Sequence, residues 1–150
     1  MNLGDFSVNR SNRARLSRFL KGEALILRGV SALKYMELFV DDHFTFDVKT
    51  ERIFVYAKEA LTGGNFDVKI VPNFSDIHYD DAGSVLCSTL SQVVHDALDE
   101  PGLVSQDVLV EALANYYEEV GHFEDVEIKA MHLAEFQRLK ALAMSFYEVT

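Results

Sequence analysis

The stretch ERIFVYAKEALTGGNFDVKIV, residues 51–71, decides the fold class of this chain of 150 residues. Its first part, IFVYA (53–57), is a continuous apolar run of the length of a buried strand. Its last part, NFDVKIV (65–71), alternates apolar and charged side chains, as a half-buried strand does. The glycine pair 63–64 between the two parts predicts a hairpin turn. A β-sheet is therefore expected at the centre of the chain.

Other candidate strands are short and lie on both sides of this stretch, at residues 43–48, 77–79 and 84–87. Residues 24–27 form an apolar run that suits either a strand or the start of a helix. Together these segments give four to six strands in roughly fifty residues, which is typical of a mixed or antiparallel sheet.

Apolar side chains at helical spacing mark the two ends of the chain. Before the sheet they predict helices at residues 9–21 and 31–38. After the sheet, three helices are expected at 89–98, 105–120 and 126–147. Thr89 and Ser105 are good N-caps, and Gly121 closes the second of these helices. The order of elements predicts an α+β fold: N-terminal helices, a sheet of four to six short strands, then three C-terminal helices.

Composition points to one globular domain over residues 1–150. The 49% hydrophobic and 11% aromatic content is that of a packed protein, and only two prolines occur. We divide the domain into a basic helical arm (1–22), a core (23–120) and a C-terminal helix (121–150). The polar first residues show no secretory signal, and no run is long enough to span a bilayer. A cytoplasmic protein without membrane partners is expected.

Cys87 is the only cysteine, so an internal disulfide and a multi-cysteine zinc site are excluded. A small buried hydrophobe is the expected role of this residue. The sequence contains no GxSxG, GxxxxGK[ST], GxGxxG or HExxH motif. We therefore expect no catalytic residue, no metal and no cofactor.

Histidines beside carboxylates leave a metal-dependent hydrolase open as an alternative. Such an enzyme would use His78, Asp80, Asp81, His95 and Asp96. Helical spacing would also place His95 near Asp99, and Glu118 near His122. In a chain this rich in acidic residues, pairings of this kind arise by chance, and a hydrogen-bonded histidine is the commoner outcome.

Charge is distributed unevenly along the chain. Residues 1–34 hold seven basic side chains and two acidic ones, although the whole chain has a net charge of −10. Residues 10–21 are the only segment expected to reach nucleic acid, through phosphate contacts of Arg10, Arg13, Arg15 and Arg18. Two alternatives are that these arginines pair with the acidic body of the chain, or that they are only solvated.

Between Lys69 and Lys129 there is no lysine or arginine, but there are thirteen acidic residues. This region is a solvated surface, an interface for a basic protein, or a mimic of nucleic acid, as in an accessory protein of a mobile element. The exposed sides of the helices at 89–98 and 105–120, with the loops beside them, are expected to form an acidic face. Its residues are Asp99, Glu100, Asp107, Glu111, Glu118 and Glu119.

Two segments are similar to motifs of a known family. SALKYMEL (31–38) resembles the SAL-x-Y-x-x-L helix of the antitoxins of AbiE-type abortive-infection systems, which are type IV toxin–antitoxin systems. TLSQVVHD (89–96) stands where that family has [ST]-P-E-R-T-L-x-D, and DVLVEALANYY (107–117) fits the helix that follows. The matching positions are Ser31, Leu33, Tyr35, Leu38, Thr89 and Asp96. The resemblance covers about residues 24–117.

The resemblance implies a non-catalytic protein that counters a toxin resembling a nucleotidyltransferase, without requiring a tight, stable complex. Two departures limit what it implies. Leu90, Ser91 and Gln92 replace the family's Pro-Glu-Arg, so the ion-pairing role of that segment is lost. Only about twenty residues precede the similar region, too few for the winged-helix DNA-binding domain that the family usually has. Operator binding, the usual repressor activity of the family, is therefore not carried over to this chain, whereas self-association remains open.

Overall fold

The computed structural model describes residues 20, 24–40, 52–62, 65–82 and 85–148 of the chain. Its strands are β1 (Leu25–Leu27), β2 (Ile53–Ala57), β3 (Phe66–Ile70), β4 (Tyr79–Ala82) and β5 (Val85–Ser88). Its helices are α2 (Gly29–Tyr35), α3 (Leu90–Asp99), α4 (Gln106–Val120), a 3-10 turn η1 (Ala130–His132) and α5 (Leu133–Glu148). The chain is therefore α+β, with a mixed five-stranded sheet, and the three expected C-terminal helices are present.

The expected helix at 9–21 lies outside the described residues except for Leu20, which is helical and buried. The expected strand at 43–48 also lies outside them. Within the described ranges, no helix combines the length and the hydropathy that a membrane span requires.

The sheet has the strand order β3-β2-β1-β5-β4, with the short β1 in the centre. β1 pairs antiparallel with β2 and parallel with β5. These two neighbours of β1 come from distant parts of the sequence. The outer pairs differ as well, because β2 and β3 are parallel whereas β4 and β5 are antiparallel. Residues 24–27, which suited either a strand or a helix, thus become the central strand.

The prediction of a hairpin between β2 and β3 is wrong, because these strands run parallel with Ile53 opposite Phe66 and Ala57 opposite Ile70. The eight residues 58–65 must therefore lead the chain back along a strand about 16 Å long. Eight residues reach about 26 Å when extended, so the return needs no helix. The glycine pair 63–64 falls within this connection and outside the described residues. Glycines signal a change of direction, but they do not fix the direction of the next strand.

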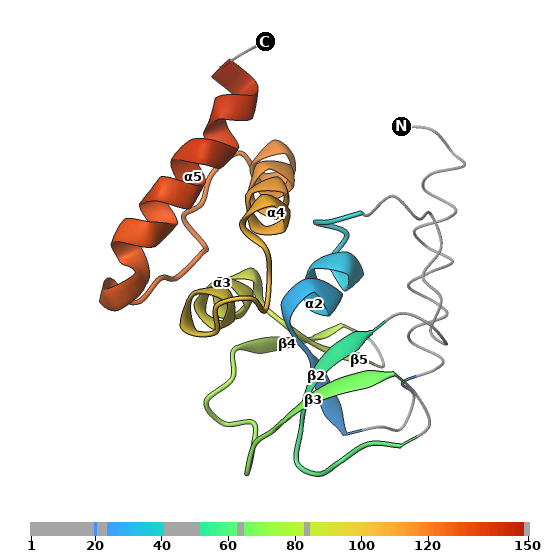
Figure 1. The fold of residues 1–150 in the computed structure, drawn as a ribbon. Coiled ribbons are helices and arrows are strands. Elements are labelled where there is room, and N and C mark those ends of the chain that lie inside the picture. The colour runs from blue at the N-terminus through green and yellow to red at the C-terminus, as the bar shows by residue number, and fades with distance from the viewer. Residues whose placement is uncertain (1–19, 21–23, 41–51, 63–64, 83–84, 149–150) are drawn as a thin grey trace, which may run out of the picture.

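One face of the sheet supplies the core. Alternate side chains of the central strands, such as Leu25, Leu27, Val55 and Cys87, are buried in one apolar cluster with residues of α2, α3 and α4. Figure 1 shows these helices gathered on one side of the sheet, with α5 outermost against α4. Cys87 is buried as expected. Helices α4 and α5 are therefore the part of the helical layer that lies farthest from the sheet.

Helix α2 is shorter than the expected helix at 31–38. It ends at Tyr35, Met36 is its C-cap, and Glu37 takes a left-handed φ of 62°. The N–H of Leu38 then donates to the carbonyl of Leu33, so Leu38 is buried without being helical. Helical spacing alone would have continued the helix to Leu38. The packing of Leu38 in the core therefore determines where α2 ends.

The N-caps and the Gly121 cap were predicted correctly. The hydroxyls of Thr89 and Ser105 accept hydrogen bonds from the N–H groups of Gln92 and Val108, both at 3.3 Å. Gly121 closes α4 with a left-handed φ of 85°. Each cap satisfies a backbone group that the helix end would otherwise leave open.

The last helix was predicted to begin at 126, but it begins at Leu133. The segment before it is held by side chains of α3 instead. The N–H of Glu127 donates to Ser91 Oγ at 2.9 Å, and that of Lys129 donates to His95 Nε2 at 3.1 Å. These bonds replace the ones that a helix would give the same N–H groups. The apolar stripe expected along this segment consists of His132, Phe136, Leu139, Ala143 and Phe146. The first four are buried, and the side chain of Phe146 lies outside the described ones.

Candidate functional site

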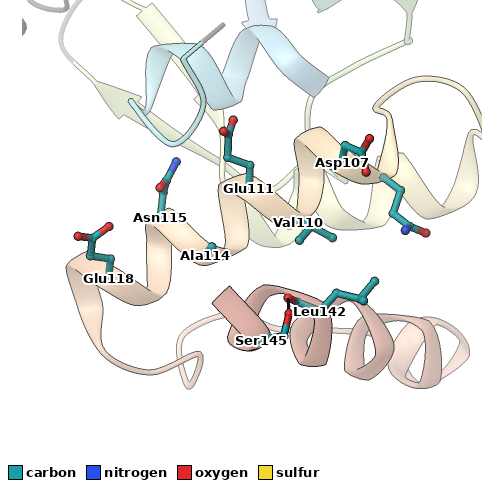
Figure 2. A pocket seen from close by; sticks show the side chains of 9 residues that line it. Asp107, Val110, Glu111, Ala114, Asn115, Glu118, Leu142 and Ser145 are labelled. Carbon is teal, nitrogen blue, oxygen red and sulfur yellow. Dashed lines mark hydrogen bonds between the residues drawn. The ribbon is translucent and has the colours of Figure 1, made fainter. Parts of the chain in front are cut away.

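A groove of about 610 Å³ lies along α4 and reaches α5. Its lining residues on α4 recur at the spacing of one helix face, and α5 adds two more. They are Gln106, Asp107, Val110, Glu111, Ala114, Asn115, Glu118, Leu142 and Ser145. Figure 2 shows Val110 pointing toward α5, and Leu142 and Ser145 on the side of α5 that faces α4. The groove is therefore a product of the packing of these two helices.

Burial divides the groove into a floor and a rim. Val110 and Ala114 are buried, whereas Asp107, Glu111 and Glu118 are exposed. Asn115 is fixed in place because its Nδ2 donates to the carbonyl of Leu38 at 2.8 Å. The result is an apolar floor beside a row of three carboxylates.

Among the described residues, little compensates the charges of this row, apart from the helix dipole at Asp107 in the first turn of α4. None of the described residues that line the groove is basic. Asp107 and Glu111 are four residues apart on a helix, a spacing at which like charges repel. Glu118 lies in the last turn of α4, where the helix dipole disfavours a negative charge. That turn contains no basic residue that would offset the effect. The groove is thus suited to a ligand that brings positive charge.

One cation does lie at the end of the groove. Arg138 Nη2 donates to Gln106 Oε1 at 2.7 Å, but its Nε also donates to Glu135 at 3.0 Å. The hydrogen bond from Arg138 lowers the pKa of the Glu135 carboxyl. Because Arg138 is already paired with Glu135, it does not neutralise the carboxylates of α4.

The remaining residues of the expected acidic face lie elsewhere. Asp99 Oδ1 is 2.6 Å from Nε2 of His132, the last residue of η1. Glu100 pairs with Arg28 and, at 3.1 Å, with Lys69. Glu119 is exposed but does not line the groove. The structure therefore brings together Asp107, Glu111 and Glu118 of the six residues.

A buried ion cluster, which sequence patterns did not predict, joins α3 to the sheet. Arg28 is only 3% exposed, with its Nε 3.7 Å from Asp96 Oδ2 and its guanidinium 4.5 Å from the ring centre of Tyr56. Burial acts to lower the pKa of Arg28, but the charges of Tyr56, Asp96 and Glu100 outweigh it, so the pKa is raised. Burial, together with a hydrogen bond to Asp96, raises the pKa of Tyr56. The charges are balanced internally, which indicates a structural cluster.

A signal for this cluster exists in the sequence. Arg28 interrupts the apolar run ALILRGVSAL, and a charge in such a run needs a buried partner. The partner Asp96 is 68 residues away, so the sequence alone gives no means of choosing it among the other carboxylates.

The histidines considered as metal ligands are separated in the structure. His78 precedes β4, where Asp80 and Asp81 are exposed. His95 Nε2 accepts the N–H of Lys129, and burial lowers the pKa of His95. In the described part of the chain, no three His, Cys, Asp or Glu side chains are grouped as metal ligands would be.

The positions that resemble the AbiE-type motifs have structural contacts here. Ser31 Oγ accepts the N–H of Phe54 at 2.9 Å, and Leu33 and Tyr35 are buried in the core. Thr89 caps α3, and Asp96 belongs to the cluster with Arg28. The four phosphate-contact candidates Arg10, Arg13, Arg15 and Arg18 lie outside the described residues.

Comparison of the chain with family models, curated proteins and solved structures gave no match.

Proposed function

We propose that this protein acts by binding, and that the groove along α4 receives a basic segment of a protein partner. The observation that carries the proposal is the row of Asp107, Glu111 and Glu118 beside an apolar floor. The row extends over twelve residues of helix, or about 16 Å. This length suits a peptide segment with several cationic side chains.

The chemistry of the groove selects the class of partner segment. Apolar side chains of the segment would cover Val110, Ala114 and Leu142, and its arginines or lysines would pair with the carboxylates. The pairing would also relieve the repulsion within α4 and the unfavourable charge in its last turn. Binding would therefore be favoured by contacts that the described residues do not make among themselves.

The resemblance to AbiE-type antitoxins suggests the class of protein to which the partner belongs. It implies a toxin resembling a nucleotidyltransferase, and such a protein holds nucleotide phosphates with cationic side chains. We propose that the groove receives a basic segment of such a toxin and thereby counters it. The resemblance supports this identity, and the groove supports the mode of contact.

The test is protection against the toxin. A strain would express a nucleotidyltransferase-like toxin encoded next to this protein's gene, together with the protein or its triple variant Asp107→Asn, Glu111→Gln and Glu118→Gln. We expect the triple variant to lose protection of growth, with toxin affinity weakened at least tenfold in calorimetry. The matched control, Glu119→Gln with Glu124→Gln and Asp125→Asn, removes the same charge from exposed positions outside the groove.

Equal protection by the two triple variants would contradict the proposal. The control also distinguishes mimicry of nucleic acid, in which a broad acidic surface is read and Glu119 contributes as much as Glu118. Far-UV circular dichroism of both variants must match the parent, so that a loss of protection reports on the groove and not on folding.

A further inference from the structure

The outer edge of β3 presents backbone groups that can bond to a further strand. Among the described strands, β3 comes first in the sheet order and pairs only with β2. The carbonyl of Asn65, just before β3, and the N–H of Val71, just after it, both bond to β2. Backbone groups alternate sides along a strand, so the N–H and carbonyl of Val68 point away from β2. Val68 is therefore the centre of an edge that a strand of another molecule can extend.

The sequence of this edge is complementary to itself. β3 consists of Phe66, Asp67, Val68, Lys69 and Ile70. When two copies of β3 pair antiparallel about Val68, each Asp67 lies opposite a Lys69, and each Phe66 lies opposite an Ile70. The outward backbone groups make Val68 a hydrogen-bonded pair, so its flanking pairs are the closer kind, with Cα atoms about 4.5 Å apart. The two-fold axis thus forms two cross-strand ion pairs at once.

The side chains of β3 are accessible for this contact. Ile70 is 61% exposed, which leaves a large apolar side chain in water. Lys69 Nζ lies 3.1 Å from Glu100, and Asp67 Oδ2 lies 3.5 Å from Arg52 Nε. Both of these ion pairs are exposed. An ammonium group has three donors and a carboxylate has about four acceptor sites, so each group can keep its present partner and add one from a second copy.

The opposite edge of the sheet lacks this complementarity. β4 consists of Tyr79, Asp80, Asp81 and Ala82, and it pairs with β5 on its inner side. Two copies of β4 paired antiparallel about their middle bring carboxylates opposite carboxylates, which repel. Charges of one sign are a common means of protecting a sheet edge from association. Of the two edge strands that the structure describes, β3 is therefore the one suited to a second copy.

We propose that two copies of this protein associate through β3, antiparallel and centred on Val68, so that their sheets become continuous. Ion pairs between Asp67 and Lys69 of opposite copies fix the register. The contact goes beyond the proposed function, because β3 contributes no residue to the groove along α4. A contact made mainly by one short strand buries little surface, so the dimer is expected to be weak.

Charge exchange in the full-length chain tests both the occupant and the register. Asp67→Lys places lysine opposite Lys69 of the other copy, and Lys69→Asp places two aspartates opposite each other. Each variant alone should associate about tenfold more weakly than the parent, because two attractive pairs become repulsive. An equimolar mixture of the two variants should regain the parent's association, since the heterodimer again contains two ion pairs. Sedimentation equilibrium from about 10 µM to about 1 mM protein covers the range of a weak dimer.

The matched controls are Asp80→Lys and Lys129→Asp, which make the same changes of charge at exposed positions outside β3. Alone or mixed, they should associate as the parent does. Asp67→Lys also reduces the net negative charge of the chain, so a general effect of charge would strengthen its association. No association of the parent at about 1 mM, or no recovery in the mixture of Asp67→Lys with Lys69→Asp, would overturn the proposal.

Val68→Pro tests the backbone part of the contact. Proline removes the N–H that bonds across the two-fold axis, whereas β2 does not use this group. We expect the variant to lose association while its far-UV circular dichroism matches that of the parent. A folded proline variant that associates as the parent does would show that the dimer forms elsewhere and contradict the proposal. All these measurements are made without a toxin, so their failure leaves the protection experiment valid.

Discussion

Arg28 shows most clearly how a single residue connects distant parts of this molecule. It ends the run of β1, and its guanidinium lies between Tyr56 of β2 and Asp96 of α3. Two buried ions stabilise a fold only as a pair, since each alone has lost the water that solvated it. The cluster therefore adds little net stability to the fold. It holds α3 against the sheet because separating Arg28 from Asp96 would leave two buried charges unpaired.

Replacing Arg28 by alanine should therefore be severe. It leaves Asp96 buried without its cation, and we expect a loss of about 3–5 kcal/mol in the free energy of unfolding, measured by urea denaturation. Lys69→Ala is the matched control, because it removes a cation from the exposed Lys69–Glu100 pair. The control should cost less than about 1 kcal/mol. Similar costs for the two variants would show that the buried pair is unimportant.

His95 should make stability depend on pH. Its burial, with Lys129 and His132 nearby, lowers its pKa in the folded state below 6.5 and outweighs the opposing effect of Asp99 and Asp96. The unfolded state therefore takes up the proton first as pH falls. Stability is fully present above about pH 6.5 and is lost as pH falls toward the folded-state pKa.

We expect the urea midpoint of the parent to fall between pH 7 and pH 5 by more than that of His95→Gln. Glutamine retains an oxygen that can accept the N–H of Lys129, but it does not titrate. His132 and Asp99 are unchanged in the variant, so the difference between the two curves isolates His95. Parallel curves would rule out this role of His95.

At the scale of elements, α4 is capped at both ends but carries acidic residues at the end where its dipole disfavours them. Ser105 caps its start and Gly121 closes it, yet Glu118 and Glu119 occupy the end where the dipole favours cations. A residue that costs stability where it stands is a candidate for function. Glu118 fits this description because it lines the groove.

Glu118→Gln should therefore act in opposite directions on stability and on binding. We expect the free energy of unfolding to rise by a few tenths of a kcal/mol, because an unfavourable charge leaves the end of the helix. Partner affinity should fall at the same time. Glu119→Gln is the matched control, with the same gain in stability and no change in affinity. Loss of affinity in both variants would assign the effect to net charge alone.

The cap of α4 supplies a further test. Gly121 has a φ of 85° and open space where a side chain would be, so an alanine there is strained only by its backbone. We expect Gly121→Ala to lower the free energy of unfolding by about 1–2 kcal/mol. Gly121→Asn should cost less, because asparagine tolerates the left-handed region better than alanine. Equal costs would mean that the strain is not what limits this position.

The predictions from sequence succeeded where one residue determines the outcome and failed where a distant contact does. Thr89, Ser105 and Gly121 carry their own chemistry, so both N-caps and the end of α4 could be read directly. The direction of β3 depends on its pairing with β2, and the loop before α5 depends on Ser91 and His95. Neither contact leaves a local signal.

The groove was anticipated only in part. The acidic residues of α4 were expected to form an exposed face, and Asp107, Glu111 and Glu118 share one. Asp99 and Glu100 were assigned to the same face by charge and position alone. Their actual contacts, with His132 and with Arg28 and Lys69, depend on tertiary packing that no spacing rule contains.

At the scale of the whole molecule, the segregation of charge has an electrostatic consequence. A body of strongly negative charge attracts a basic partner from a distance, and salt weakens this attraction. Measured partner affinity should therefore fall as the salt concentration rises, and it should fall less steeply in the variant Asp107→Asn, Glu111→Gln and Glu118→Gln.

The central position of β1 has a consequence for the order of events during synthesis. Leu27 pairs with Val55 on one side and Cys87 on the other, so the middle of the sheet waits for residues translated about sixty positions later. Until β5 leaves the ribosome, β1 has one unpaired edge, and until α3 follows, Arg28 has not met Asp96. Contacts so distant in sequence slow folding. The nascent chain should therefore resist protease only after residue 100 has emerged, which limited proteolysis of stalled ribosome complexes can measure.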